Sequence, residues 1–199
     1  MSVYIKICGL RDAEHVAAAV EAGADAVGFV FAKSVRQLSA QQAKAVASEL
    51  PAAVKRVAVM RHPTDSEWQA VLAEFEPDVL QTDIEDFAGL DVPDNVQRWP
   101  VIREKCAAAM EPMPEVFVYE GANSGAGETV DWTRAAVLAR QGQMILAGGL
   151  AAGNVAEAIR TVRPWGVDVS SAVESSPGKK NIELIRQFIG AVRATENNS

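Results

Sequence analysis

Two side chains capable of acid–base chemistry lie where apolar runs end. Cys8 closes the run Lys6-Ile7-Cys8, and Glu120 follows the run Val116-Phe117-Val118-Tyr119. A thiolate can remove a proton if nearby positive charge lowers the pKa of the cysteine. A carboxyl group at a partly desolvated position has a raised pKa and can donate a proton near neutral pH. Cys8 and Glu120 are a candidate base and acid, although a small buried cysteine and a solvated strand-end carboxylate explain the same positions.

Two short segments near the C-terminus could bind an anion. Each follows an apolar run and precedes a helical pattern, so backbone N–H groups and a helix N-terminus are expected to face outward together, which suits a phosphate. We call them the glycine turn, Gly148 and Gly149, and the serine turn, Ser170, Ser171 and Ala172. They predict a small phosphorylated ligand.

Arg36 lies in a short segment, 33–37, just before a helical pattern opened by Ser39. A guanidinium there could hold a substrate carboxylate through two parallel N–H bonds, or it could be an exposed loop charge. His15 and His62 are interpreted as structural or solvated, and no Ser/His/Asp arrangement is evident.

The elements that must position these groups alternate between strands and helices. Eight strands are expected at 3–8, 26–31, 56–60, 78–81, 96–102, 116–119, 144–147 and 166–169. Helices are expected at 12–22, 39–50, 65–75, 133–140, 153–163 and 181–194, several of them opened by Asp, Ser or Asn. The fourth and fifth connections are poor in helical signal and are expected to be abbreviated.

This alternation predicts an α/β protein, a small single (β/α)8 TIM barrel over residues 1–199 with a polar tail at 195–199. A dinucleotide-binding fold is disfavoured because no Gly-x-Gly-x-x-Gly follows the first strand. Catalytic groups in such barrels come from the C-terminal ends of the strands. Besides the residues above, that rule nominates Arg61, His62, Asp83 and Arg103.

Strand alternation makes one structural prediction inside the barrel. Lys6 shares a strand face with Cys8, and Asp168 shares one with Ser170. The first and last strands are neighbours in a closed barrel. We therefore expect a buried ion pair between Lys6 and Asp168 beneath the site, because a lone buried charge is costly. The glycine-rich loop 121–127 is expected to be a mobile lid.

Composition narrows the possible partners. The chain has 199 residues, 49% of them hydrophobic, and a net charge of -7, which argues against a nucleic-acid surface. No apolar run reaches the roughly 18 residues that a membrane span needs. Cys8 and Cys106 have no metal-like spacing. We expect a cytoplasmic protein without nucleic-acid or membrane partners, either a monomer or a homodimer.

Taken together, these residues resemble the phosphoribosylanthranilate isomerase family. The matching stretches run from the first strand to the last helix and cover nearly the whole chain. They are Lys6 to Leu10, Ala24 to Phe31, Ser34 to Arg36, Gly125 to Trp132, Leu146 to Leu150 and Val167 to Gly178.

The resemblance implies an aldose–ketose isomerase of tryptophan biosynthesis, an intramolecular oxidoreductase. It would catalyse the Amadori rearrangement of N-(5-phosphoribosyl)anthranilate without cofactor or metal. It also implies Cys8 as the base, Arg36 near the anthranilate carboxylate, and phosphate on the glycine and serine turns. Glu120 stands where the family's general acid is an aspartate, so the carboxyl group is carried on one extra methylene.

Other departures from the family pattern leave alternatives open. Asp83 replaces a histidine, Asn181 an aspartate and Ala172 a glycine, whose substitution would hinder phosphate if that position had a positive φ. One alternative is a phosphate-metabolite-binding barrel of the same lineage with weakened catalysis. Another is the related aminoaldose-phosphate isomerase of histidine biosynthesis, which is disfavoured because no half-to-half repeat is visible.

Overall fold

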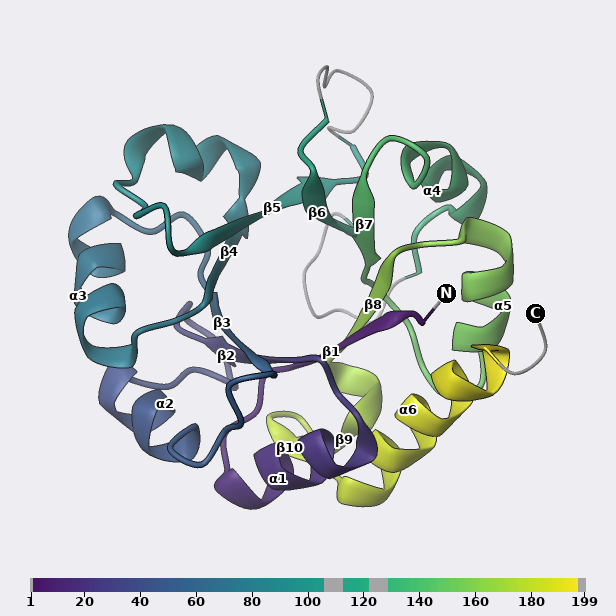
Figure 1. Cartoon of the computed structure of the whole chain (residues 1–199), viewed down its shortest axis with the longest axis horizontal. Helices are drawn as coiled ribbons and strands as arrows, with labels where there is room; N and C mark the ends of the chain where they lie inside the picture. Colours follow the sequence, from purple (N-terminus) through teal and green to yellow (C-terminus); the bar gives the residue numbers. More distant parts are fainter. Residues whose placement is uncertain (1, 106–112, 122–128, 197–199) are drawn as a thin grey trace.

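Eight parallel strands close into a barrel in the order β1 to β8 (Figure 1). This computed structural model describes residues 2–105, 113–121 and 129–196. The strands are β1 Tyr4–Cys8, β2 Ala26–Val30, β3 Lys55–Val59, β4 Val79–Asp83, β5 Gln97–Arg103, β6 Val116–Glu120, β7 Gln143–Leu146 and β8 Gly166–Val169. The predicted (β/α)8 barrel is confirmed, and each expected strand is present within one or two residues of its predicted ends.

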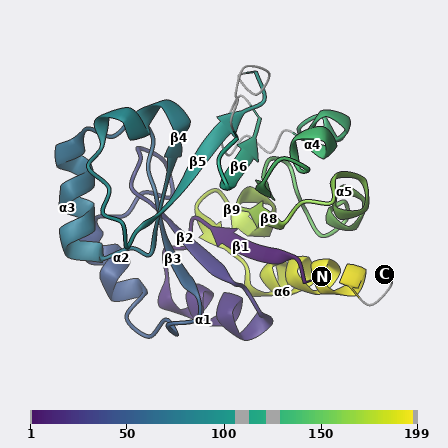
Figure 2. The same cartoon turned by 45° about the horizontal axis from the view of Figure 1, so that its top comes forward.

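Helices lie on the outside of the barrel (Figure 2). They are α1 Ala13–Ala22, α2 Ala40–Val46, α3 Asp65–Phe75, α4 Trp132–Leu138, α5 Val155–Val162 and α6 Ile182–Glu196. The fourth connection holds only a 3-10 helix, η1, at Ile84–Gly89, as its weak helical signal predicts. Residues 106–112 of the fifth connection and residues 122–127 of the predicted lid lie outside the described residues. Within the described residues, no helix has the length and apolar character to span a membrane.

Three features differ from the sequence-based expectations. Helix α2 ends at Val46 rather than Leu50, since the residues that lead into Pro51 form turns. Helix α6 continues to Glu196, so it includes the first two residues of the predicted tail. A two-stranded hairpin, β9 Glu174–Ser176 and β10 Lys179–Lys180, was not predicted.

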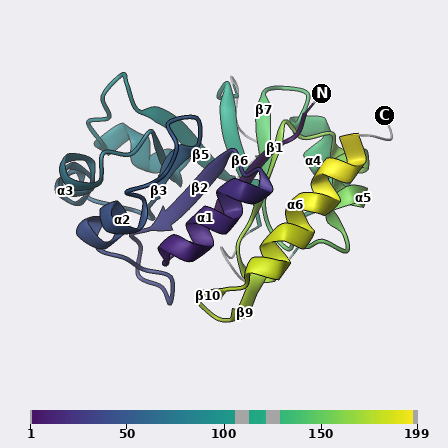
Figure 3. The same ribbon diagram turned by 60° about the horizontal axis from the view of Figure 1, so that its bottom comes forward.

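The hairpin follows β8 and therefore lies at the end of the barrel where the strands finish. Figure 3 shows it beyond α1 and α6, which pack side by side on the outside. Gly178 forms its turn with a φ of 81°. A Cβ atom on Gly178 would lie 2.7 Å from the carbonyl oxygen of Val35, so the hairpin packs closely against the loop that carries Arg36.

Strand alternation separates two apolar cores. One fills the barrel interior and consists of Ala26, Val57, Val79, Trp99, Val101, Val118, Ile145 and Ala147. The other lies between the barrel and its helices and includes Ile5, Ile7, Phe29, Ile185 and Phe188. Ile5 and Ile7 of β1 point outward to this second core. Because side chains alternate along a strand, Lys6 and Cys8 point into the barrel.

The predicted ion pair inside the barrel is confirmed. Lys6 and Asp168 are partners in the β1–β8 register. The Lys6 Nζ lies 2.9 Å from Asp168 Oδ2, and the lysine has no exposed surface. Burial alone would lower the pKa of Lys6, but the Asp168 carboxylate and Cys8 outweigh burial and raise it. Lys6 therefore carries its positive charge beneath the barrel mouth.

Candidate active site

Cys8 ends β1 on the inner face and is buried, with 8% of its surface exposed. Its register partner on β2 is Gly28. A Cβ atom on Gly28 would lie 3.0 Å from Cys8 Sγ and 3.3 Å from Lys6 Cε. The glycine therefore makes room for both side chains. Sequence reasoning did not single out Gly28, because only the register between the two strands reveals the contact.

The electrostatic environment of Cys8 is mixed. Burial is the largest influence and raises the pKa of the thiol, while Lys6 and Lys180 lower it and Asp168 raises it. The nearby positive charge that a thiolate base requires is present, but its effect is smaller than that of burial. Cys8 therefore rests mainly as the thiol at neutral pH.

Glu120 ends β6, and its alternation with the barrel-core residue Val118 directs it inward. Its register partner on β5 is Arg103. Arg103 Nη1 donates to Glu120 Oε2 at 3.0 Å, and Arg103 Nε donates to Asp83 Oδ1 at 2.6 Å. The neighbouring strands β4, β5 and β6 thus end in a carboxylate, a guanidinium and a second carboxyl group.

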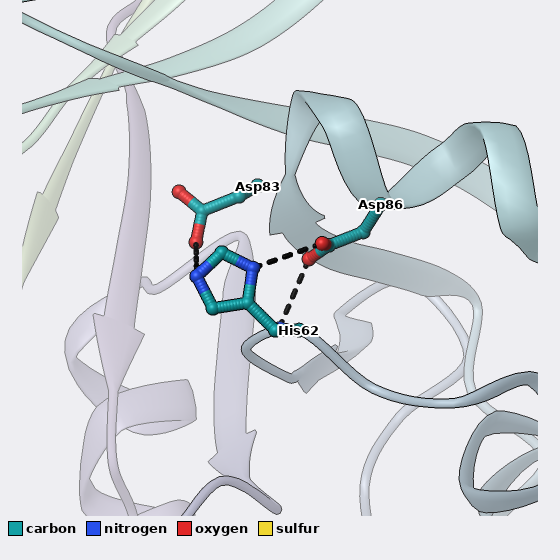
Figure 4. Close-up of side chains that lie close together, drawn as sticks. All are labelled: His62, Asp83 and Asp86. Carbon is teal, nitrogen blue, oxygen red and sulfur yellow. Dashed lines mark hydrogen bonds and ion pairs between the residues drawn. The ribbon is translucent and has the colours of Figure 1, made fainter.

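Asp83 also belongs to a second group of charges with His62 and Asp86, shown in Figure 4. The His62 Nδ1 lies 2.9 Å from Asp86 and its Nε2 lies 3.7 Å from Asp83. The hydrogen bond with Asp86 raises the pKa of His62. The His62 side chain is 55% exposed, which agrees with its interpretation as a solvated histidine. One ligand atom of each residue lies within 4.8 Å of the others. Because Asp83 is already bound by Arg103, we interpret the group as an ion-pair network rather than a metal site.

Arg36 lies in the loop between β2 and α2, and its guanidinium is held by Glu174 at the start of β9. Its Nε and Nη2 donate to the two carboxylate oxygens at 2.7 and 2.9 Å. Lys180 from β10 donates to Glu174 at 2.8 Å and to the Ser170 carbonyl at 2.9 Å. Burial alone would raise the pKa of Glu174, but these cations lower it to about 2. Sequence reasoning missed Glu174 and Lys180 as site residues because they belong to the unpredicted hairpin.

The glycine turn follows β7 and needs its glycines. Gly148 and Gly149 have φ values of 92° and 61°, in the left-handed region that favours glycine. The side chain of Asn154 accepts from the backbone N–H of Ala151 and donates to the carbonyl of Gly149. These bonds shape the loop that leads into α5.

The serine turn follows β8 and leads into a short 3-10 helix, η3, at Ser171–Val173, rather than an α-helix. Ala172 lies within η3 and does not have a positive φ. The methyl group at this position therefore carries no backbone strain. Since β7 and β8 are neighbours, the two turns lie next to each other.

All of these groups gather at one end of the barrel, because parallel strands end on the same side. Cys8 and Glu120 come from β1 and β6. Arg36 and the two turns come from the loops after β2, β7 and β8. The fold and the side chains at its mouth define the class of (β/α)8-barrel enzymes.

Comparisons with known proteins identify the family. Residues 5–191 match the family model of N-(5'-phosphoribosyl)anthranilate (PRA) isomerase. A Pseudomonas fluorescens isomerase of that name is 40% identical over 212 residues, covering 96% of this chain and 99% of the relative. A Listeria monocytogenes isomerase is 37% identical over 204 residues with the same coverage. The chain belongs to the phosphoribosylanthranilate isomerase family.

Solved structures agree with this conclusion. The phosphoribosyl anthranilate isomerase of Thermotoga maritima has a TM-score of 0.83 at 29% identity, covering 96% of this chain and 99% of that one. A second solved structure is a phosphoribosyl anthranilate isomerase in complex with reduced 1-(o-carboxyphenylamino)-1-deoxyribulose 5-phosphate. It has a TM-score of 0.78 at 30% identity, with the same coverage.

Proposed function

We propose that this chain converts N-(5-phosphoribosyl)anthranilate to 1-(2-carboxyphenylamino)-1-deoxyribulose 5-phosphate, with Cys8 as general base and Glu120 as general acid. The observation that carries the assignment is that both side chains belong to the inner face of the barrel and end their strands at the same mouth. Family membership supplies the substrate class.

The reaction needs one proton donor and one proton acceptor. Glu120 gives its proton to the furanose ring oxygen, the ring C–O bond breaks, and the anthranilate nitrogen forms a Schiff base with the sugar. Cys8 then acts in its thiolate form, the minor form at neutral pH, and removes the proton from the neighbouring sugar carbon to leave an enolamine. Tautomerisation of the enolamine gives the ketone. Both steps are general acid–base catalysis and need no redox partner.

The two ends of the substrate are assigned to different loops. The phosphate binds to backbone N–H groups of the glycine turn and the serine turn. The anthranilate carboxylate lies near Arg36, whose Nε and Nη2 are occupied by Glu174. The substrate would therefore meet the remaining Nη1 side of a guanidinium that is already fixed in place.

We further propose a cytoplasmic enzyme that works without cofactor or metal, as a monomer or a homodimer. The proton transfers described above require only protein side chains. One solved structure contains generated monomers of the Thermotoga maritima isomerase, which is itself described as dimeric. The assembly state of this chain can be measured by sedimentation equilibrium.

Two conservative substitutions test the assignment. Cys8→Ser and Glu120→Gln should each lower kcat by at least about 100-fold, because each removes one proton-transfer group. Turnover is followed by the fluorescence of the anthranilate substrate. Binding of the reduced product analogue should change little, since each substitution nearly keeps the size of the side chain and leaves the glycine turn and the serine turn unaltered.

Unchanged turnover in either variant would remove that residue from the mechanism. If the unaltered chain binds the analogue but shows no turnover, the alternative of a catalytically weakened binding barrel is correct.

A further inference from the structure

We propose that Asp83 is a positioning residue that acts through Arg103 to keep Glu120 able to donate a proton. The inference rests on the proposed role of Glu120 as the acid and adds a residue to that site. It assigns a function to a carboxylate that the reaction itself does not use.

The three residues occupy equivalent places on neighbouring strands. Asp83 ends β4, Arg103 ends β5 and Glu120 ends β6. Each continues the alternation of a barrel-core residue on its own strand, so all three side chains point inward. Their side chains are largely buried, with exposed fractions of 4%, 17% and 15%. The geometry places one cation between two acids at the barrel mouth.

Arg103 uses different nitrogens for the two acids. Nε donates to Asp83 at 2.6 Å, and Nη1 donates to Glu120 at 3.0 Å. Because the guanidinium is planar and rigid, the bond to Asp83 fixes the direction of the bond to Glu120. Asp83 thus determines where Arg103 points its second donor.

Charge gives Asp83 its second effect. An arginine beside a carboxyl group favours the ionised form, which has no proton to donate. The carboxylate of Asp83 offsets the charge of Arg103 from the other side, and the offset is strong because the site is largely shielded from water. Glu120 can then hold a proton before the reaction, and Arg103 can stabilise the carboxylate after the proton has left.

Other charges of the described residues surround this group. Three of them lie in the neighbouring loops. His62 contacts Asp83 and is itself bound by Asp86. The charge of Glu85 acts on Arg103. On the other side of β6, strand β7 leads into Ala147, which is uncharged. Asp83 is the carboxylate among these that binds Arg103 directly, which makes it the residue to change.

The decisive experiment is the pH dependence of kcat for Asp83→Asn. Loss of the carboxylate removes one negative charge that offsets Arg103, so Glu120 should give up its proton at lower pH. We expect the basic limb of the profile to move down by about one pH unit. We also expect kcat at pH 8 to fall about tenfold, with KM changed less than about threefold.

Two variants separate this effect from a loss of structure. Asp83→Glu keeps the charge and should retain the basic limb of the unaltered chain, even if kcat falls because the bond to Arg103 is displaced. Asp86→Asn removes a neighbouring carboxylate that binds His62 rather than Arg103, and its basic limb should not move. Thermal unfolding and binding of the reduced product analogue show whether each variant is folded.

The proposal is overturned if folded Asp83→Asn keeps the basic limb of the unaltered chain, or if Asp86→Asn moves it equally. It is also overturned if Asp83→Glu behaves like Asp83→Asn, since charge would then not be the cause. Failure of the proposed function appears differently, as full activity in Glu120→Gln.

Discussion

At the scale of single residues, the site depends on how closely two backbones approach. Gly28 has no side chain, and Cys8 and Lys6 occupy the space that its Cβ would take. The thiol is thereby held beside the Lys6–Asp168 ion pair, in which Lys6 lowers the pKa of Cys8 and Asp168 raises it. The environment of Cys8 therefore depends on residues of three strands, β1, β2 and β8.

Gly28→Ala tests this close packing. The added methyl group would lie 3.0 Å from Sγ and 3.3 Å from the backbone Cα of Cys8, so either the thiol or the strands must move. We expect a loss of about 1–3 kcal/mol in the free energy of unfolding, as for other overpacked cores. We also expect kcat to fall by more than tenfold, because misplacement of a catalytic group by about 1 Å can cost 100-fold.

A matched control for Gly28→Ala is available in α6. A Cβ atom on Gly190 would meet nothing within 4 Å, and alanine is the better helix former. Gly190→Ala should be neutral or stabilising and fully active. Equal stability and kcat in the two alanine variants would show that the space beside Cys8 is not limiting. Urea unfolding and steady-state kinetics provide both measurements.

The residue scale also shows what a sequence can predict. The Lys6–Asp168 pair follows from strand parity and barrel closure alone, both of which are regular. The Glu174–Arg36 pair does not, because it joins a loop after β2 to a hairpin after β8. Side-chain directions in loops depend on the packing of distant segments, which hydrophobic periodicity does not encode.

At the scale of elements, the eight barrel strands and the six α-helices of the described residues were predictable because their periodicity is strong. Capping residues also helped: Ser39 forms a capping box with Gln42, and Asp131 accepts from the first backbone N–H groups of α4. The hairpin β9–β10 was missed because its strands are short and polar. Its turn signal, Pro177-Gly178, was nevertheless present in the sequence.

The hairpin makes stability depend on acidic pH through Glu174. Its pKa is lowered from 4.5 to about 2 in the folded protein. A lowered pKa means that the unfolded chain binds the proton first, so the stabilisation is complete above about pH 4.5 and disappears as the pH falls toward 2. The difference in free energy of unfolding between the unaltered chain and Glu174→Gln should therefore shrink over this range.

Urea unfolding at pH 7, 4.5 and 3 measures that difference. At pH 7 the variant should be the less stable, because Arg36 and Lys180 lose a charged partner. A difference that stays constant from pH 4.5 to pH 3 would show that the two cations do not lower the pKa of Glu174.

At the scale of the whole molecule, a protein with a net charge of -7 binds an anionic substrate. Several cations of the described residues near the mouth are already bound by carboxylates. Lys6, Arg36, Arg103 and Lys180 each form an ion pair with a carboxylate. Attraction must then be local, and backbone N–H groups at the ends of β7 and β8 are the groups suited to hold the phosphate. The closed barrel brings these N–H groups together because the neighbouring strands β7 and β8 end in adjacent turns.

The central claim is that Cys8 and Glu120 act on one sugar from the inner face of the barrel. A crystal structure of this chain with the reduced product analogue tests it most directly. The account predicts Cys8 Sγ and a Glu120 carboxylate oxygen each within about 3.5 Å of the sugar atom it serves, with the phosphate on the glycine and serine turns. An analogue bound with either side chain more than about 6 Å from the sugar, beyond the reach of direct proton transfer, would contradict the account.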